Sequence, residues 1–502
     1  MIGKAFTFAA AALALAAAAP AGAQDYPPQP DPGPMRPFVL PQTETFTLPN
    51  GLQVTLIPYG IAPKATVSLR VEAGNIDDGD DVWLADLTGA MLREGAGERS
   101  SAELAEAAAG MGGQLGIGVQ LHETSVNLNV LSEHAADAVR LIADVATRPA
   151  LPESELDRVR QDLLRNRAVA LSQPQPVADA VFARAYYGDH PYGRSFPSEA
   201  QLAGYMIEDV RRFHGDHFGA RRARLYVASL FAPAWSRQAM EQSLGGWASG
   251  TEAPALPPQP RQGPQLLLVD RPGAPQSTIR IGFPAPAAGE SADIPMRVMN
   301  ALLGGSFTSR ITQNIREDKG YTYSPGSGIQ FHAGEAVWVF DADVTTGDTG
   351  AALREVFGEI RELQTEAPPA DEASGIGTWL AGTFILQNAS SGGLIGSLAN
   401  RDLHGLPANW LETYVPAVLA VDSARIQAMA RERLPLERMT VVIVGGLGTV
   451  RPALGGVAPP RNAPACHRRG ALPSTHPDDA KHPPSSWPGP QSYWSLPRTT
   501  PI

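Results

Sequence analysis

The sequence predicts an α+β protein made of two homologous domains, each a sheet covered by helices. The first observation is an internal repeat, because Leu56–Thr66 resembles Leu268–Thr278 at an offset of 212 residues (268 − 56). A second pair, Gly118–His122 and Gly328–His332, repeats at an offset of 210 (328 − 118). The second observation is that period-two apolar runs alternate with long amphipathic stretches. This order indicates an α+β layer rather than a doubly wound sheet.

Each expected element follows from its own hydrophobic period. Strands are predicted where apolar residues alternate, at Gln53–Ile57, Ala65–Val71, Glu123–Leu131, Gln265–Val269, Thr278–Phe283 and Ala336–Asp343. Helices of the first copy are predicted at Trp83–Arg93, Ser101–Gly110, Ala135–Thr147, Glu153–Ser172 and Ile207–His217. Helices of the second copy are predicted at Ile294–Leu303, Arg310–Glu317, Gly350–Glu366, Asp371–Ser390 and Val421–Arg433.

Proline-rich stretches separate these elements into segments. Residues 24–42 are predicted to be an extended, mobile leader, and residues 251–264 a linker between domains at 43–250 and 265–455. From 456 to 502 the chain is rich in Pro, His, Ser and Arg without a hydrophobic period, so we expect a disordered tail.

The ends and the charge indicate where the protein works and what it does not bind. Residues 1–23 combine Lys4, a short alanine-rich apolar run and an Ala-x-Ala end, which is typical of a cleaved signal peptide. We therefore expect a periplasmic protein without membrane insertion. The only cysteine, Cys466, excludes an internal disulfide. A net charge of −11 without a basic cluster argues against nucleic-acid binding.

Several polar clusters have simpler explanations than a catalytic one. His214 and His217 end a predicted helix, where packing is the favoured role. His122 and Glu123 are neighbours on a strand, so their side chains point to opposite faces. No Gly-x-Ser-x-Gly motif is present, and the one cysteine lies in the tail, so nucleophilic catalysis has no candidate residue.

Several segments, in the right order, resemble the pitrilysin/insulinase family of zinc metallopeptidases, which includes the mitochondrial processing peptidases. The resemblance covers nearly all of residues 43–455. It is carried by Leu48–Thr55, Trp83–Gly95, His190–Arg194, Ile207–His214, Leu303–Arg310 and Ile315–Ser324. The resemblance implies that the two domains form one half of a metallopeptidase clamshell that admits unfolded peptides.

The family's zinc motif, His-x-x-Glu-His, is absent from this chain. Its three chemical positions are occupied by Asp86, Gly89 and Ala90, and the position of the family's third ligand, a glutamate, falls on Asn166. Two of these four residues have no side-chain donor, so we expect no metal or cofactor in this chain. Residual binding through Asp86 is the minor alternative.

Two other family positions are intact. An arginine and a tyrosine that contact the substrate near the scissile carbonyl correspond to Arg316 and Tyr323, seven residues apart. A guanidinium and a phenol suit charge that develops on a carbonyl oxygen. The alternative is structural, with Arg316 capping a helix or pairing with Glu317 or Asp318. The family's peptide-binding edge strand falls on Gly116, Gly118 and Gln120, where an ordinary glycine-rich turn is an equal alternative.

An intact arginine–tyrosine pair without a zinc motif predicts a division of labour. We expect the non-zinc subunit of a periplasmic heteromeric zinc endopeptidase, with Zn²⁺ held by a homologous partner subunit and unfolded peptides as substrates. The alternative is a non-catalytic peptide-binding or scaffold protein of the same family. A peptidase with a displaced site of its own is the third reading, but no replacement set of ligands is visible.

Overall fold

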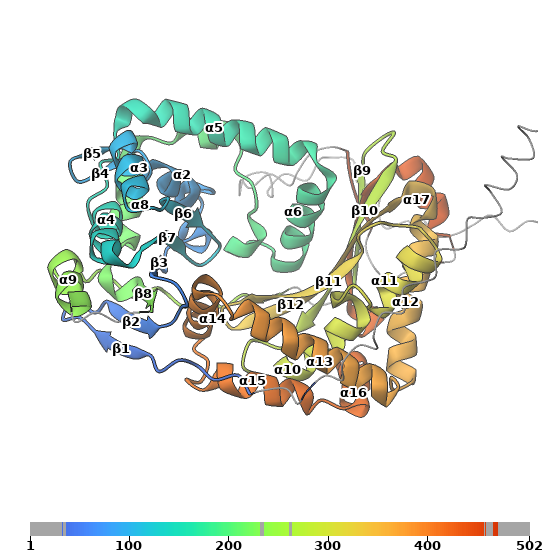
Figure 1. The fold of residues 1–502 in the computed structure, drawn as a ribbon. Coiled ribbons are helices and arrows are strands. Elements are labelled where there is room, and N and C mark those ends of the chain that lie inside the picture. Colours follow the sequence, from blue (N-terminus) through green and yellow to red (C-terminus); the bar gives the residue numbers. More distant parts are fainter. Residues whose placement is uncertain are drawn as a thin grey trace, which may run out of the picture. The chain divides into compact units, whose positions relative to one another are not determined.

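The computed structural model describes Gly33 and residues 37–230, 235–260, 264–455, 457 and 465–469. The predicted signal peptide and most of the predicted leader and tail lie outside these residues. From Phe38 onward the described chain forms one compact unit that contains two six-stranded sheets and a two-stranded ribbon. Each large sheet is flanked by helices (Figure 1). The predicted α+β class is confirmed.

The first sheet has the order β1-β2-β8-β3-β7-β6. Its strands are β1 Glu44–Thr47, β2 Gln53–Pro58, β3 Lys64–Val71, β6 Gly116–Val119, β7 Thr124–Leu131 and β8 Ala223–Ser229. The ribbon pairs β4 Gly95–Ala96 with β5 Arg99–Ser100. Strands β2 and β8 run parallel, and every other pair in the first sheet is antiparallel.

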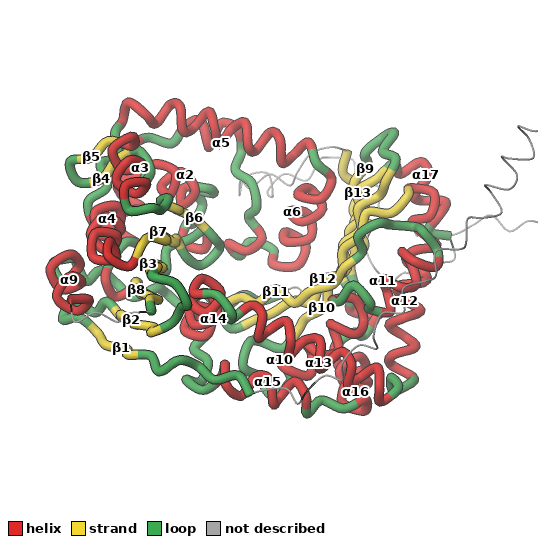
Figure 2. Tube along the Cα trace, viewed as in Figure 1, coloured by secondary structure: helices red, strands yellow, loops and turns green. Residues whose placement is uncertain are grey.

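The second sheet has the order β11-β12-β10-β13-β9-β14. Its strands are β9 Gln265–Asp270, β10 Gln276–Ala285, β11 Gly326–His332, β12 Glu335–Thr345, β13 Thr440–Gly445 and β14 Ala465–Arg469. Read from the other edge, five strands repeat the order of the first sheet, with the parallel pair β9 and β13 matching β2 and β8. The sixth differs, because β14 is parallel to β9 whereas β1 is antiparallel to β2. The repeat in the sequence is therefore a repeat of topology over these five strands. Figure 2 shows the strands of both sheets in yellow.

Helices of the first repeat are α2 Leu84–Met91, α3 Ser101–Gly110, α4 Ala135–Thr147, α5 Glu153–Ser172, α6 Pro174–Tyr187, α7 Glu199–Gly204, α8 Ile207–His217 and α9 Trp235–Leu244. Helices of the second repeat are α10 Asp293–Asn300, α11 Arg310–Thr312, α12 Thr349–Thr365, α13 Ala370–Gln387, α14 Ser391–Leu403, α15 Trp410–Leu419, α16 Ser423–Arg433 and α17 Leu447–Ala453. Two wider π-helical turns, η5 Ala301–Gly305 and η6 Gln313–Asp318, follow α10 and α11.

Helix α6 belongs to the first repeat in sequence but packs on the second sheet. Phe182 of α6 lies so close to β10 that a Cβ on Gly282 would be 2.2 Å from its ring. The face it covers carries Val337 and Val442, while the neighbouring Val441 faces the opposite core, as strand alternation requires. Figure 1 shows α6 beside β9 and β10.

Helix α14 makes the reciprocal exchange, since it belongs to the second repeat and packs against β3 and β8 of the first sheet. Tyr226 and Ala228 on β8 join the apolar core of the second repeat, and the Tyr226 hydroxyl donates to Asp402 Oδ2 on α14 at 2.8 Å. The two exchanged helices bind the repeats into one unit.

Two terminal segments differ from the sequence prediction. Ala465–Arg469, inside the tail predicted to be disordered, is strand β14 and pairs in parallel with β9. Strand β14 lies beside β9, as β1 lies beside β2 in the first sheet. Without β14, β9 would be an edge strand with unpaired N–H and C=O groups. The end of the leader is also anchored, since the Phe38 ring lies 5.3 Å from the Phe384 ring of α13. Within the described residues, no helix is both long and apolar enough to cross a membrane.

Candidate functional site

Helix α2 carries the positions of the missing zinc motif, and a buried carboxylate fixes its start. Asp78 accepts backbone hydrogen bonds from Trp83 at 2.9 Å and Ala85 at 2.7 Å, which satisfies donors that the first turn of a helix leaves unpaired. Burial raises the pKa of Asp78 to about 7. Asn75 Nδ2 donates to Asp78 at 3.2 Å and to Asp86 at 2.6 Å, so one amide holds both acids.

Asp86 is the only one of the three motif positions with a side chain that could ligate a metal. It is half-buried, and burial raises the pKa of its carboxyl group. Its Oδ2 atom already accepts from Asn75. This carboxylate is therefore part of a local hydrogen-bond network that fixes the end of η1, Asn75–Asp77, against α2.

At Gly89 an apolar side chain fills the space that a ligand would need. A Cβ on Gly89 would lie 2.3 Å from Cγ2 of Val119 on β6, so any larger side chain here requires the Val119 side chain to move. Ala90 packs against the apolar core of the first repeat. Asn166, at the position of the third ligand, is exposed on α5. The four residues do not fit a zinc ion, and no group of three potential ligands occurs anywhere in the described chain.

Arg316 and Tyr323 lie together at the surface of the second repeat. The Arg316 Cζ atom is 5.0 Å from the centre of the Tyr323 ring and 4.5 Å from that of Phe307. Tyr323 is 78% exposed and the Arg316 side chain 23%. Glu317 Oε1 lies 3.2 Å from Arg316 Nε, which is one of the structural contacts that the sequence left open. Within the described part of the chain, neither Nη group of Arg316 donates a hydrogen bond, and the ion pair uses only Nε.

The local chain explains why these two side chains meet. Arg316 is in η6, whose wider turn ends where the backbone N–H groups of Gly320 and Tyr321 donate to Arg316 and Ile315. Thr322 then bonds to the backbone of Asp343 on β12, through a hydroxyl contact of 2.7 Å. Tyr323 follows directly and projects outward, three residues before β11 begins.

Gly116 and Gly118 are in β6, at the free edge of the first sheet, and the exposed Gln120 follows in the turn. Arg93 donates to the Ile117 carbonyl oxygen, so part of this edge is already occupied. The turn at Gln120 is tightly packed, because a Cβ on Gly74 would lie 2.3 Å from the Gln120 carbonyl oxygen. Peptide addition at this edge stays a prediction.

Phe307 is the neighbour of the pair that sequence reasoning missed. It lies between η5 and α11 and is 64% exposed, whereas Ser306 and Ser309 on either side are buried. A single phenylalanine in a loop has no periodicity to mark it. The only signal was its place within Leu303–Arg310, a segment that already carried the family resemblance.

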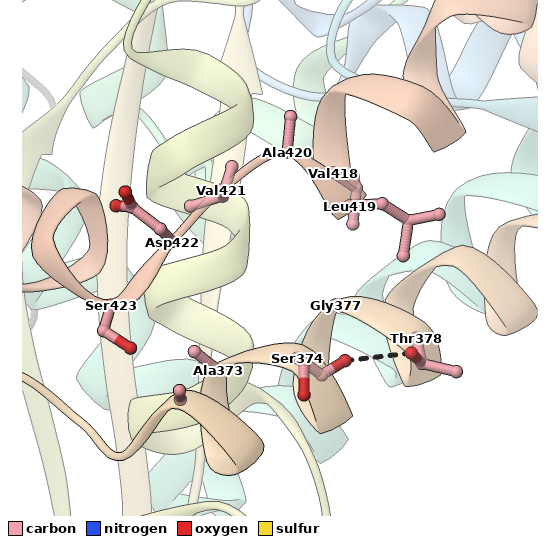
Figure 3. A pocket seen from close by; sticks show the side chains of 11 residues that line it. Ala373, Ser374, Gly377, Thr378, Val418, Leu419, Ala420, Val421, Asp422 and Ser423 are labelled. Atoms are coloured by element: carbon pink, nitrogen blue, oxygen red, sulfur yellow. Dashed lines mark hydrogen bonds between the residues drawn. The ribbon is translucent and has the colours of Figure 1, made fainter.

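A hollow of about 290 Å³ lies elsewhere on the second repeat, between α13 and the turn that joins α15 to α16 (Figure 3). Its lining is mostly small and uncharged. The one carboxylate, Asp422, accepts from the Arg425 backbone N–H at 2.8 Å and caps α16. The Thr378 hydroxyl bonds to the Ser374 carbonyl oxygen. These groups serve their own helices, and the hollow contains no acid–base pair.

Comparison with known proteins finds relatives that match both repeats. Residues 55–197 match the model of insulinase (peptidase family M16), and residues 206–375 match the peptidase M16 inactive domain. The chain is 23% identical over 403 residues to the uncharacterized zinc protease YmxG of Bacillus subtilis, covering 77% of this chain and 94% of the relative. It is 25% identical over 416 residues to an uncharacterized zinc protease of Mycobacterium bovis, covering 81% and 93%.

Solved structures show the same fold. A peptidase M16 inactive domain from Pseudomonas fluorescens superimposes with a TM-score of 0.74 at 22% identity, covering 80% of this chain and 98% of that one. A protease from Helicobacter pylori gives a TM-score of 0.74 at 17% identity, covering 81% and 100%.

Proposed function

Because this chain belongs to the insulinase (M16) family of peptidases, we propose that it is the non-zinc subunit of a periplasmic heteromeric zinc endopeptidase. In this proposal a homologous partner subunit holds Zn²⁺ and supplies the activated water. This chain contributes Arg316 and Tyr323, which hold an unfolded peptide near its scissile carbonyl.

The chemistry of the pair suits this task. As a peptide bond is attacked, its carbonyl oxygen gains negative charge, and donors already in place stabilise that charge more than they stabilise the ground state. The Nη groups of Arg316 and the hydroxyl of Tyr323 are such donors. The Tyr323 ring against the guanidinium limits the motion of both groups, so less ordering is needed when a peptide binds.

The observation that carries the proposal is the contrast between the two repeats. At the metal position, Val119 occupies the space beside Gly89, whereas Arg316 is in contact with Tyr323, whose side chain is largely exposed to solvent. If Arg316 and Tyr323 were buried or far apart, a structural role alone would explain them. This pair has unused donors at the surface instead.

The second candidate is a peptide-binding or scaffold protein without a catalytic role. The Glu317 contact favours it, because this ion pair compensates the Arg316 charge without any substrate. The two candidates differ in one respect that can be measured. A scaffold does not need the donors of Arg316 and Tyr323 for turnover, whereas a shared catalytic site does.

The decisive experiment co-expresses the chain with the zinc-motif homologue of the same organism and measures cleavage of an internally quenched unfolded peptide. Arg316→Ala and Tyr323→Phe should each lower kcat, by about 10²-fold for the arginine, because transition-state donors are lost. Matched controls are Arg425→Ala, an exposed ion-paired arginine on α16, and Tyr321→Phe, a half-buried tyrosine nearby.

Size-exclusion chromatography with light scattering must show that every variant still assembles with the zinc-motif homologue. Normal turnover by both Arg316→Ala and Tyr323→Phe in an assembled complex would refute the shared site and leave the scaffold function.

A further inference from the structure

The exposed ring of Phe307 lies over the candidate catalytic arginine. Its centre is 4.5 Å from Arg316 Cζ, well inside the ~6 Å over which a guanidinium and an aromatic ring attract each other. The ring is 64% exposed, so burial of its own surface does not explain its position. What it contacts is the charged group itself.

The chain around Phe307 is fixed, and this makes the contact a defined one. Ser306 and Ser309 are buried, and the Ser309 hydroxyl bonds to the Thr312 hydroxyl at 2.9 Å. The Ser309 backbone N–H donates to the Ser306 carbonyl oxygen at 3.1 Å, which closes a turn with Phe307 at its tip. The ring therefore projects from an anchored turn.

Arg316 contacts two aromatic rings and one acid. Phe307 and Tyr323 lie 4.5 and 5.0 Å from Cζ, and Glu317 lies beside Nε. A guanidinium is planar and donates only in its plane. Contacts with two rings and a carboxylate at Nε together restrict the orientation of the guanidinium. A free arginine side chain would lose rotamer entropy on adopting one such orientation.

We propose that Phe307 is a positioning residue for Arg316, which holds the guanidinium in the orientation that the reaction uses. This inference rests on the proposed function of Arg316. Phe307 itself contacts no substrate in this scheme and acts through the arginine. Its aromatic face, rather than its apolar bulk, is the property that matters, because the attraction comes from the ring quadrupole.

The test uses the assembled complex with the zinc-motif homologue and the same quenched peptide. Phe307→Ala should lower kcat about tenfold with KM changed less than twofold, because orientation matters more in the transition state than in the bound ground state. Phe307→Tyr should retain most of the rate, whereas Phe307→Leu, which keeps the apolar bulk, should be as slow as Phe307→Ala. Trp379→Ala, an exposed aromatic residue on α13, is the matched control and should leave kcat unchanged.

A double-mutant cycle separates this inference from the proposed function. In an Arg316→Ala background, Phe307→Ala should cause no further loss, since the residue it positions is gone. Three results would overturn the positioning role while the role of Arg316 stands: a wild-type kcat in Phe307→Leu, additive losses in the double-mutant cycle, or loss of complex assembly in Phe307→Ala. Normal turnover by Arg316→Ala would overturn both.

Discussion

At the scale of single residues, the two parts of the candidate site differ. Around Gly89 the space for a ligand has closed, because Val119 packs where a side chain would begin. Around Arg316 the two Nη groups have no hydrogen-bond partner among the described residues, because the aromatic contacts are with Phe307 and Tyr323 and Glu317 lies at Nε. An exposed side chain is not by itself evidence of a function. A charged side chain such as Arg316, which is held by two rings and a carboxylate, is stronger evidence.

Arg316→Lys tests whether geometry or charge matters at this residue. Lysine keeps the positive charge but has a compact ammonium group that cannot stack on an aromatic ring as a plane or donate from a planar edge. We expect kcat of the complex to fall at least about tenfold, with the melting temperature of the chain within about 2 °C of wild type. Peptide cleavage and calorimetry measure the two quantities. A lysine variant as fast as wild type would show that charge alone is sufficient.

At the scale of elements, α2 shows how packing can exclude a metal. Glycine inside a helix normally costs about 1 kcal/mol relative to alanine. Gly89→Ala should nevertheless destabilise the chain by about 1–3 kcal/mol, because the new Cβ would lie 2.3 Å from Val119. The control is Gly375→Ala on α13, where a Cβ meets nothing within 4 Å, and this variant should raise the unfolding free energy of the chain. Urea unfolding measures both.

The double variant Gly89→Ala with Val119→Ala completes this test, since the shorter side chain removes the clash and should recover much of the lost stability. Equal stabilisation by Gly89→Ala and Gly375→Ala would mean that Val119 on β6 moves aside without lowering the unfolding free energy. The metal position would then not be closed by packing.

Elements with a clear period were predictable from the sequence, and α4, α5 and α8 begin and end at the predicted residues. Helices α6 and α14 were missed. Pro174 and Pro176 open the first, and three glycines weaken the second, so local propensity argued against both. Each is stabilised by the sheet of the other repeat, and no local pattern encodes that contact.

The candidate site was predictable to a similar degree. The resemblance identified Arg316, Tyr323 and the empty metal positions, because it depends on residue identity at fixed spacing. The contact between Phe307 and Arg316 and the closure of Gly89 by Val119 depend on how distant segments pack, so only the structure shows them.

At the scale of the whole molecule, equivalent turns of the two repeats meet. His122 follows β6 and His332 ends β11, and their ring centres are 6.1 Å apart. Tyr192 lies between them, with ring centres 5.5 and 4.5 Å from the two histidines. Burial lowers the pKa of each histidine to about 4, and each positive charge would oppose the other. Both rings are therefore neutral in the folded chain at neutral pH.

Other titratable groups face this histidine pair. His190 and His404 also oppose its protonation, and Asp77 favours protonation of His122. The Tyr187 ring packs against His332, and the Tyr187 hydroxyl donates to Glu335 at 3.1 Å. Burial raises the pKa of Glu335 to about 7. The stability that Glu335 contributes is therefore lost as the pH rises toward 7, which is opposite to the pH dependence of the two histidines.

For the histidine pair the sign is fixed by linkage. The unfolded chain binds protons near pH 6.5 and the folded chain only near pH 4, so acid favours unfolding across that interval. We expect wild type to lose on the order of 2 kcal/mol of unfolding free energy between pH 7 and pH 4.5 through each of these two residues. His122→Phe and His332→Phe should each reduce that slope, because phenylalanine does not titrate. The exposed His134→Phe is the matched control. Urea unfolding at a series of pH values measures the slope, and an unchanged slope in both variants would show that the contact between the repeats does not sense protons.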